Sequence, residues 1–248
     1  ELADFLKSHG VHINYDAAHV AGLIAGGEFQ DPLREGVDTM TMSTHKTLFG
    51  PQGGLVLAFE NNAEAIKKAT FPGLTSSHHI HHMAAKAITF AEALEFGKDY
   101  AAQTIKNAKA LAVALNDNGF KVLGEKKGFT QSHQTVVNVL DYGDGGKIEA
   151  ELEKANIIVN RQLIPGDLKA KRHYMHPGGI RLGTSEVTRL GMKESEMQQI
   201  ASFINQIVID KKDAKGVADQ VIEFRKSYQK TQYCFDNKLG AYEYVKLR

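Results

Sequence analysis

Apolar residues recur at two different spacings along the chain, and the change of spacing separates predicted helices from predicted strands. Apolar positions three and four residues apart predict helices, whereas short apolar or β-branched runs bounded by turn residues predict strands. We expect helices at residues 1–8, 63–69, 83–96, 100–116, 147–155, 194–208 and 213–228. We expect strands at residues 11–16, 39–43, 54–59, 120–123, 135–140, 157–160 and 180–182, with a short helix or turn at 17–25.

These predicted elements form two groups that meet in the helical stretch before residue 116. The first strands alternate imperfectly between apolar and polar residues, as parallel strands do when both faces are covered. The later elements mix short strands with amphipathic helices. We therefore expect an α/β chain with a partial large domain at residues 1–97, a small α+β domain at 98–212, and a carboxyl-terminal helix and tail at 213–248.

Composition changes this picture little. The chain has 248 residues, 42% hydrophobic and 24% charged, as is usual for globular proteins. A net charge of +1 gives no argument for nucleic-acid or membrane partners. The single cysteine, Cys234, excludes an internal disulfide framework and fits a reducing compartment, so we expect a cytoplasmic protein. The chain starts at Glu1 without a methionine, and we expect it to be a piece of a longer protein.

The stretch from Asp38 to Gly54 contains the strongest candidate for chemistry, Lys46. A lysine amine becomes an effective nucleophile towards carbonyl compounds when it is partly buried and lies near other cationic groups. Ser43, Thr44 and His45 precede it directly, and hydroxyl and imidazole groups at a turn can donate to a phosphate. Taken alone, the same pattern also fits a surface lysine in a turn between two strands.

A second candidate segment lies about thirty residues earlier, where Asp16 ends a predicted strand and His19 follows three residues later. The carboxyl end of a strand in an α/β sheet is where such folds bind ligands. A carboxylate there can pair with a protonated pyridine nitrogen, as pyridoxal phosphate requires. Considered singly, Asp16 would be a turn residue and His19 a packed or surface histidine.

Three motifs together resemble the serine hydroxymethyltransferase (glycine hydroxymethyltransferase) family. They read D-A-A-H-V-A-G-L from Asp16, S-T-H-K-T-L-F-G-P-Q-G-G from Ser43 to Gly54, and G-G-I-R-L-G-T-S-E-V-T-R from Gly178. The resemblance runs to about residue 210 and covers only the carboxyl-terminal portion of the family. It implies a pyridoxal-phosphate-dependent transferase of fold type I, in which residues 1–97 are the later part of a mostly parallel-sheet, cofactor-binding large domain.

The resemblance also implies a role for each candidate residue. Lys46 would bind pyridoxal 5'-phosphate covalently and act in catalysis. Asp16 would pair with the pyridine nitrogen, and His19 would lie near the phenolic oxygen of the ring. Ser43 and His45 would surround the ring and the phosphate.

The substrates and partners are likewise implied by the resemblance. Arg181 would bind the α-carboxylate of serine or glycine, since a guanidinium matches a carboxylate in shape and charge. Serine would give its one-carbon unit to a reduced folate and leave glycine, a reaction of amino-acid and one-carbon metabolism. The full-length protein would be a homodimer.

Several positions depart from the family pattern. Thr75, Ser76 and Ser77 stand where the family has Gln-Gly-Gly, Gln162 replaces an asparagine that meets the folate, and the loop at 167–181 is longer than usual. The acceptor is therefore either a reduced folate, a modified pterin, or none. The amino-terminal half, with several cofactor-binding residues, is absent from this chain.

Two alternatives and one cluster stay open at this point. A threonine aldolase or transaldolase on the same scaffold would need no pterin, and a non-catalytic fragment would only pack with a partner chain. His78 and His82 are spaced like zinc ligands on a helix, but no glutamate lies between them and no third ligand is evident. We therefore expect no metal site there.

Overall fold

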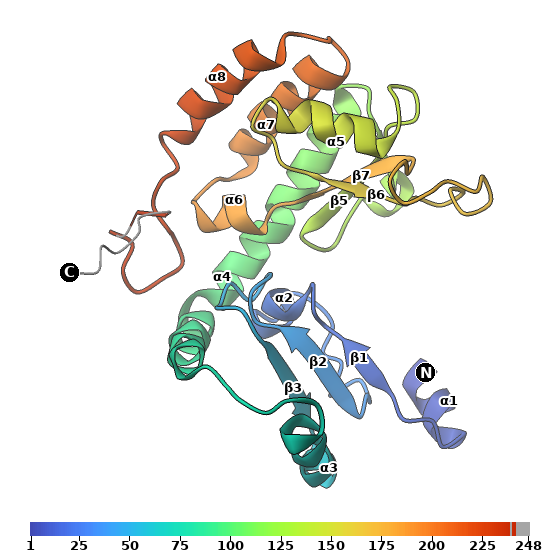
Figure 1. Cartoon of the computed structure of the whole chain (residues 1–248), viewed down its shortest axis with the longest axis vertical. Helices are drawn as coiled ribbons and strands as arrows, with labels where there is room; N and C mark the ends of the chain where they lie inside the picture. Colours follow the sequence, from blue (N-terminus) through green and yellow to red (C-terminus); the bar gives the residue numbers. More distant parts are fainter. Residues whose placement is uncertain (239, 242–248) are drawn as a thin grey trace. The chain divides into compact units, whose positions relative to one another are not determined.

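The computed structural model describes residues 1–238, 240 and 241. The chain divides into two compact units, one ending at Ala102 and the other beginning at Gln103 (Figure 1). Each unit has its own sheet. None of the described helices is both long and apolar enough to cross a membrane.

The first unit is built on a three-stranded sheet in the order β1-β2-β3. β1 pairs with β2 in parallel, with Asp16 opposite Thr41, and β2 pairs with β3 in antiparallel, with Ser43 opposite Gly54. A small apolar cluster containing Met40, Met42 and Leu48 holds one face together. The elements are α1 (Leu2–Ser8), β1 (Asn14–Asp16), α2 (Ala21–Ala25), β2 (Thr39–Ser43), β3 (Gly54–Ala58), η1 (Glu60–Asn62), α3 (Ala63–Lys68) and an irregular helical turn η2 (Ala69–Leu74).

A single helix, α4 (Ile80–Asp117), stands where the sequence predicted two. The prediction of a break between 96 and 100 was wrong, because the helix continues through Gly97. A side chain on Gly26, which follows α2, would collide with the carbonyl of Gly97 and with the Cβ of Ala101. The missing side chain on Gly26 therefore lets the end of α2 lie directly against the backbone of α4 at Gly97.

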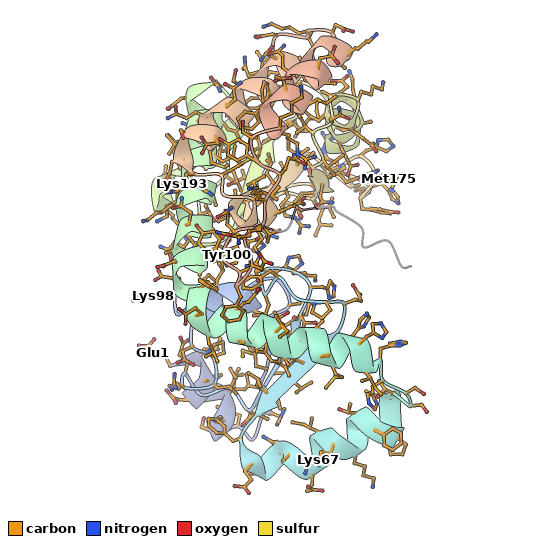
Figure 2. The ribbon with its side chains drawn as sticks, turned by 90° about the vertical axis from the view of Figure 1, so that its left-hand side faces the viewer. Glu1, Lys67, Lys98, Tyr100, Met175 and Lys193 are labelled. Atoms are coloured by element: carbon orange, nitrogen blue, oxygen red, sulfur yellow. The ribbon has the colours of Figure 1, made fainter. Side chains whose placement is uncertain are left out.

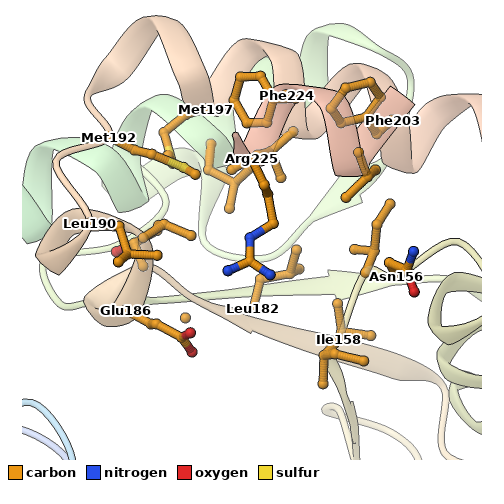
Figure 3. A pocket seen from close by; sticks show the side chains of 18 residues that line it. Asn156, Ile158, Leu182, Glu186, Leu190, Met192, Met197, Phe203, Phe224 and Arg225 are labelled. Carbon is orange, nitrogen blue, oxygen red and sulfur yellow. The ribbon is translucent and has the colours of Figure 1, made fainter. Parts of the chain in front are cut away.

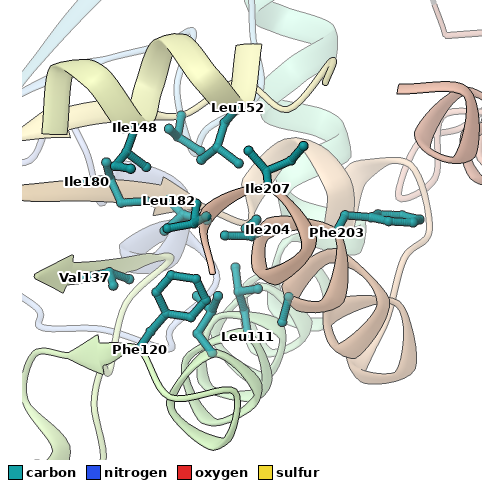
Figure 4. Close-up of a cluster of buried hydrophobic side chains, with 14 of the residues drawn as sticks. Leu111, Phe120, Val137, Ile148, Leu152, Ile180, Leu182, Phe203, Ile204 and Ile207 are labelled. Atoms are coloured by element: carbon teal, nitrogen blue, oxygen red, sulfur yellow. The ribbon is translucent and has the colours of Figure 1, made fainter. Parts of the chain in front are cut away.

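The second unit contains a four-stranded antiparallel sheet in the order β4-β5-β7-β6. Figure 4 shows its core, in which Val137 and Ile180 of the sheet face Leu152 of α5 and Ile204 of α7. Burying each such side chain stabilises the fold by about 1.5–3 kcal/mol. The elements are β4 (Lys121–Val122), η3 (Glu125–Lys127), β5 (Gln134–Asn138), α5 (Gly145–Glu153), β6 (Asn160–Gln162), β7 (Gly179–Gly183), α6 (Ser185–Arg189), α7 (Glu194–Val208) and α8 (Ala214–Arg225).

The α/β class is confirmed, and apart from α4 the differences lie in short elements. β6 begins at Asn160 although the apolar run at 157–160 predicted a strand ending there; Ile158 in that run is 77% exposed. α6 was not predicted because five residues give too little periodicity. Among the described strands of the first unit, only β1 and β2 pair in parallel. The sequence-based domain limits at 97 and 212 stay predictions.

Candidate active site

Lys46 lies in a tight turn that connects β2 to β3 and is closed by the buried Thr44. The Thr44 amide donates to the Gly53 carbonyl at 3.0 Å, and the Gly50 amide donates to the Thr44 carbonyl at 2.7 Å. The Thr44 hydroxyl donates to the Pro51 carbonyl at 2.7 Å. These three hydrogen bonds satisfy both backbone groups and the side chain of one buried residue, so they fix the path of the turn.

The side chains of Lys46 and His45 are exposed at the tip of this turn. The sequence analysis expects a reactive lysine to be partly buried. In the described chain the side chain of Lys46 is instead exposed. Phe49 has a left-handed backbone, with φ of 52°, and its ring packs edge-on against Tyr100 at a centroid distance of 4.9 Å. Its amide donates to the Lys46 carbonyl at 3.0 Å. An aromatic anchor therefore holds an uncommon backbone conformation three residues after the lysine.

Thr47 connects the lysine turn to the segment that contains Asp16 and His19. Its buried hydroxyl donates to the His19 carbonyl at 3.0 Å and accepts from the Gly22 amide at 3.0 Å. A side chain on Gly22 would collide with the Thr47 carbonyl, so the two segments are in direct backbone contact. Sequence reasoning missed the roles of Thr44 and Thr47, and their position beside a turn was the available signal.

Asp16 is the last residue of β1 and is exposed. Its Oδ1 accepts from the Ala18 amide at 2.9 Å, a local turn that holds the carboxylate at the strand end. Ser43 is the last residue of the neighbouring parallel strand β2 and is half-buried. The carboxyl ends of two adjacent parallel strands thus supply Asp16 and Ser43 directly and lead into His19, His45 and Lys46, at the edge where α/β sheets bind ligands.

Gly53 lies between His45 and Lys86, a half-buried lysine of α4 that the sequence argument did not consider. The His45 Nδ1 lies 3.4 Å from the Gly53 nitrogen, and the Lys86 Nζ donates to the Gly54 carbonyl at 3.4 Å. A Cβ at Gly53 would lie 2.5 Å from the Lys86 Nζ. Because Gly53 has no side chain, the Lys86 side chain can occupy this space. Lys86 is therefore a second cationic group, lying against the bend that follows Lys46.

Arg181 lies in the second unit, at the centre of β7. It stands opposite Val136 of β5 and Asn160 of β6, is half-buried, and donates from its Nη2 to the Asn160 Oδ1 at 3.4 Å. A central strand with partners on both sides limits backbone movement at this position. Its predicted role as a ligand of the substrate carboxylate is not tested by these contacts.

The loop before β7 is fastened by a buried carboxylate. The sequence analysis noted only the length of this loop. Asp167 is 2% exposed, and its Oδ2 accepts from the amides of Ile164 and Gly178 at 2.9 and 2.8 Å. Arg172 lies 3.4 Å from its Oδ1. The Asp167 side chain therefore joins the two ends of the loop, and the guanidinium of Arg172 compensates its charge.

The histidines at and just before the start of α4 are exposed or half-buried, and several of their rings lie against one another. The rings of His79 and His81 lie 5.5 Å apart, and those of His81 and His82 lie 4.4 Å apart. Desolvation lowers the pKa of His82, and the charges of His81, His79 and Lys86 lower it further. Within residues 1–238, 240 and 241, no group of three or more His, Cys, Asp or Glu side chains could hold a metal ion.

The family profile described as serine hydroxymethyltransferase matches residues 1–204. The chain is 78% identical over 248 residues to a serine hydroxymethyltransferase of Nitrosopumilus maritimus and 73% identical over 248 residues to that of Cenarchaeum symbiosum. Each match covers 100% of this chain and 56% of the relative, so the chain spans a little over half the length of these relatives.

A solved structure gives the same answer for the fold. The crystal structure of L-threonine transaldolase from Pseudomonas fluorescens, in its internal aldimine state, matches with a TM-score of 0.82 and 35% identity. The match covers 92% of this chain and 52% of that chain. The profile covers most of the chain and these two relatives match it along its whole length, so the chain belongs to the serine hydroxymethyltransferase family.

Proposed function

We propose that this chain is the carboxyl-terminal portion of a pyridoxal-phosphate-dependent serine hydroxymethyltransferase, which converts serine to glycine and passes a one-carbon unit to a reduced pterin. One observation carries the proposal: Thr47 fastens the Lys46 turn to the Asp16–His19 segment, at the ends of two parallel strands. The relatives are longer than this chain, so the activity belongs to the full-length protein.

The residues at this edge fit pyridoxal 5'-phosphate in their chemistry. The edge offers one exposed primary amine, one exposed carboxylate at a strand end, and hydroxyl and imidazole groups from Ser43, His45 and His19. The bound cofactor supplies an electron sink for the bond that breaks at the amino acid's Cα. Lys46 would attach the cofactor through its amine, and Asp16 would hold the proton on the pyridine nitrogen.

The substrate side of the proposal concerns Arg181. Its guanidinium, steadied by Asn160, would take the α-carboxylate of serine or glycine through paired hydrogen bonds. The acceptor is a reduced folate or a modified pterin. We further propose that the full-length protein is a homodimer and is cytoplasmic. Family membership is the support for both statements.

The test is chemical trapping of the cofactor. The protein that carries this chain, at its natural length, is mixed with pyridoxal phosphate and reduced with borohydride, and the labelled peptide is identified by mass. We expect the label on Lys46 in the wild type and in the control Lys67→Ala, an exposed lysine of α3, and no label at that peptide in Lys46→Ala. A label on another lysine in the wild-type protein would show that Lys46 is not the attachment site.

A second candidate function is threonine aldolase or transaldolase chemistry, which the solved relative favours. The two functions differ in their need for a pterin. Glycine formation from serine that depends on a reduced pterin would support the first, whereas glycine formation from threonine that is equally fast without pterin would support the second. If the 248-residue chain by itself forms glycine from neither substrate, it would be a non-catalytic fragment that packs with a partner chain.

A further inference from the structure

Charged side chains gather differently in the two units. In the second unit, the cavity in Figure 3 has a volume of about 220 Å³ and a mostly apolar lining, and the charged residues of that lining, Arg225 and Glu186, have opposite signs. In the first unit, basic side chains from the Lys46 turn and from α4 meet at the bend formed by Gly53 and Gly54. Because like charges repel, side chains of one sign at one place favour the binding of an anion.

Lys86 is the half-buried lysine of α4 whose ammonium group lies against this bend. Its Nζ donates to the Gly54 carbonyl at 3.4 Å, which is long for a hydrogen bond, and a Cβ on Gly53 would lie 2.5 Å from the same Nζ. Within residues 1–238, 240 and 241, this ammonium group has no other hydrogen bond and no carboxylate partner. A charge that is partly removed from water is stabilised by a counter-ion, so the described chain leaves Lys86 uncompensated.

Two imidazole rings add to this basic region. The His45 Nδ1 lies 3.3 Å from the Gly53 carbonyl oxygen, so His45 and Lys86 contact the same residue from different elements. His82 lies one helical turn before Lys86, and side chains four residues apart on a helix are neighbours. Like charges at that spacing destabilise a helix, and a bound anion offsets the repulsion.

We propose that Lys86 binds the phosphate group of pyridoxal phosphate beside the Lys46 turn. The ammonium group has three N–H donors, of which the described chain uses one, and a phosphate offers strong acceptor oxygens and up to two negative charges. The inference rests on the function proposed above and adds a residue that lies outside the three family motifs.

The path of the turn brings this lysine to the correct place. The Thr44 amide donates to the Gly53 carbonyl at 3.0 Å, so Gly53 lies directly across the turn from the residues that precede Lys46. Lys46 would attach the cofactor through its aldehyde carbon, and the phosphate is carried on the neighbouring ring position. A lysine against Gly53 and Gly54 therefore suits the phosphate of a cofactor that is attached to Lys46.

A purely structural role for Lys86 is the competing explanation. In that role, its hydrogen bond to Gly54 would only hold the bend against α4. The two roles differ in what they require of the ligand. An ammonium group that binds phosphate affects only an aldehyde that has a phosphate, whereas a structural hydrogen bond affects every aldehyde that reacts at Lys46.

The test compares pyridoxal phosphate with pyridoxal, which has the same aldehyde and no phosphate. The protein at its natural length, freed of cofactor, is equilibrated with increasing concentrations of either aldehyde and reduced with borohydride. Labelling of the Lys46 peptide then gives the half-saturating concentration. Lys86→Met should raise this concentration by about tenfold or more for pyridoxal phosphate, because a charged hydrogen bond is lost, and should leave it unchanged for pyridoxal.

Two further variants complete the design. Lys86→Arg keeps a positive donor and should recover most of the affinity for pyridoxal phosphate. Lys98→Met changes an exposed lysine of the same helix and should leave both half-saturating concentrations unchanged (Figure 2). Circular dichroism checks that each variant is folded.

Three results would overturn the proposal. Equal weakening of labelling by both aldehydes in Lys86→Met would make the lysine a structural residue. An unchanged half-saturating concentration of pyridoxal phosphate in that variant would show that the phosphate is bound elsewhere. Both of these results leave the proposed function in place, whereas the absence of label from Lys46 in the wild-type protein would remove that function together with this inference.

Discussion

The two units of this chain are stabilised in different ways. The apolar cluster of the first unit contains five described buried residues, whereas that of the second unit contains twenty-two. The first unit also exposes large apolar side chains, including Leu94 of α4, which is 89% exposed. What fixes the first unit is a set of buried threonine hydroxyls and close glycine contacts around Lys46. A unit with a small apolar core can therefore still hold a well-ordered turn, when buried hydrogen bonds and close glycine contacts fix the path of that turn.

The largest effect should come from the core of the second unit. Leu152→Ala removes a fully buried side chain of α5 and should lower the free energy of unfolding by about 2–5 kcal/mol, because it leaves a cavity. Urea unfolding measures the change. The control Leu94→Ala, at an exposed position of the first unit, should stay within about 0.5 kcal/mol. Equal losses from both variants would contradict the comparison.

In the first unit the most sensitive position should be a glycine. Gly22→Ala places a Cβ against the Thr47 carbonyl and should cost about 1–3 kcal/mol of unfolding free energy, since the backbone must move. Gly54→Ala is the matched control, because its Cβ would lie 3.6 Å from the nearest atom, the Met42 carbonyl oxygen. Thermal unfolding of the two variants separates a steric effect from the general effect of replacing glycine. A smaller loss for Gly22→Ala than for Gly54→Ala would rule the contact out.

The hydroxyl of Thr47 should matter next. Thr47→Val keeps the shape but leaves the Gly22 amide and the His19 carbonyl without their partner, at a cost of about 1–3 kcal/mol. Thr47→Ser keeps the hydroxyl and should recover most of that loss. If the bond positions the lysine turn, the yield of borohydride-trapped cofactor on Lys46 should fall in Thr47→Val and return in Thr47→Ser. Equal yields in both variants would mean that the bond does not position the lysine.

The smallest effect concerns pH and the second unit. The Lys147 amide, which donates to Asp144 at 2.9 Å, is the main cause that holds the pKa of Asp144 below its ordinary value, and His176 lowers it further. A lowered pKa in the folded state means stability that is present above the unfolded pKa of about 3.9 and is lost as the pH falls through the folded value.

Asp144→Asn should therefore reduce the loss of stability between pH 5 and pH 2, because an amide can still cap α5 but does not titrate there. Urea unfolding at several pH values measures this difference. The exposed control Asp117→Asn should leave the pH profile unchanged. A profile that is identical in wild type and Asp144→Asn would exclude a contribution from this cap.

Sequence reasoning succeeded where the signal is local or repeats regularly. The bounds of α7 match the prediction at residues 194–208, because four turns of an amphipathic helix repeat the same pattern. β2 matches at 39–43. The family was recognised from motifs that lie in continuous stretches. The predicted roles of Lys46, Asp16, His19, Ser43, His45 and Arg181 stay predictions.

It failed where a residue acts through a distant partner. Lys86 contacts Gly54 across 32 positions, and Thr47 contacts His19 across 28. No spacing rule links such pairs in a single sequence. The continuity of α4 through Gly97 was also missed, and the distant residue that lies against it there is Gly26.

The fastening of Asp167 has a consequence for how this part of the protein can change. One carboxylate accepts from the amides of both Ile164 and Gly178. The distance between these two ends of the loop is therefore set by Asp167 and does not depend on the residues at the tip of the loop. Insertions or deletions at the exposed residues 168–171 alter a closed, solvent-facing part of the loop and leave the register of β6 and β7 intact. Loop length in this region can therefore diverge among relatives without disturbing the strand that contains Arg181.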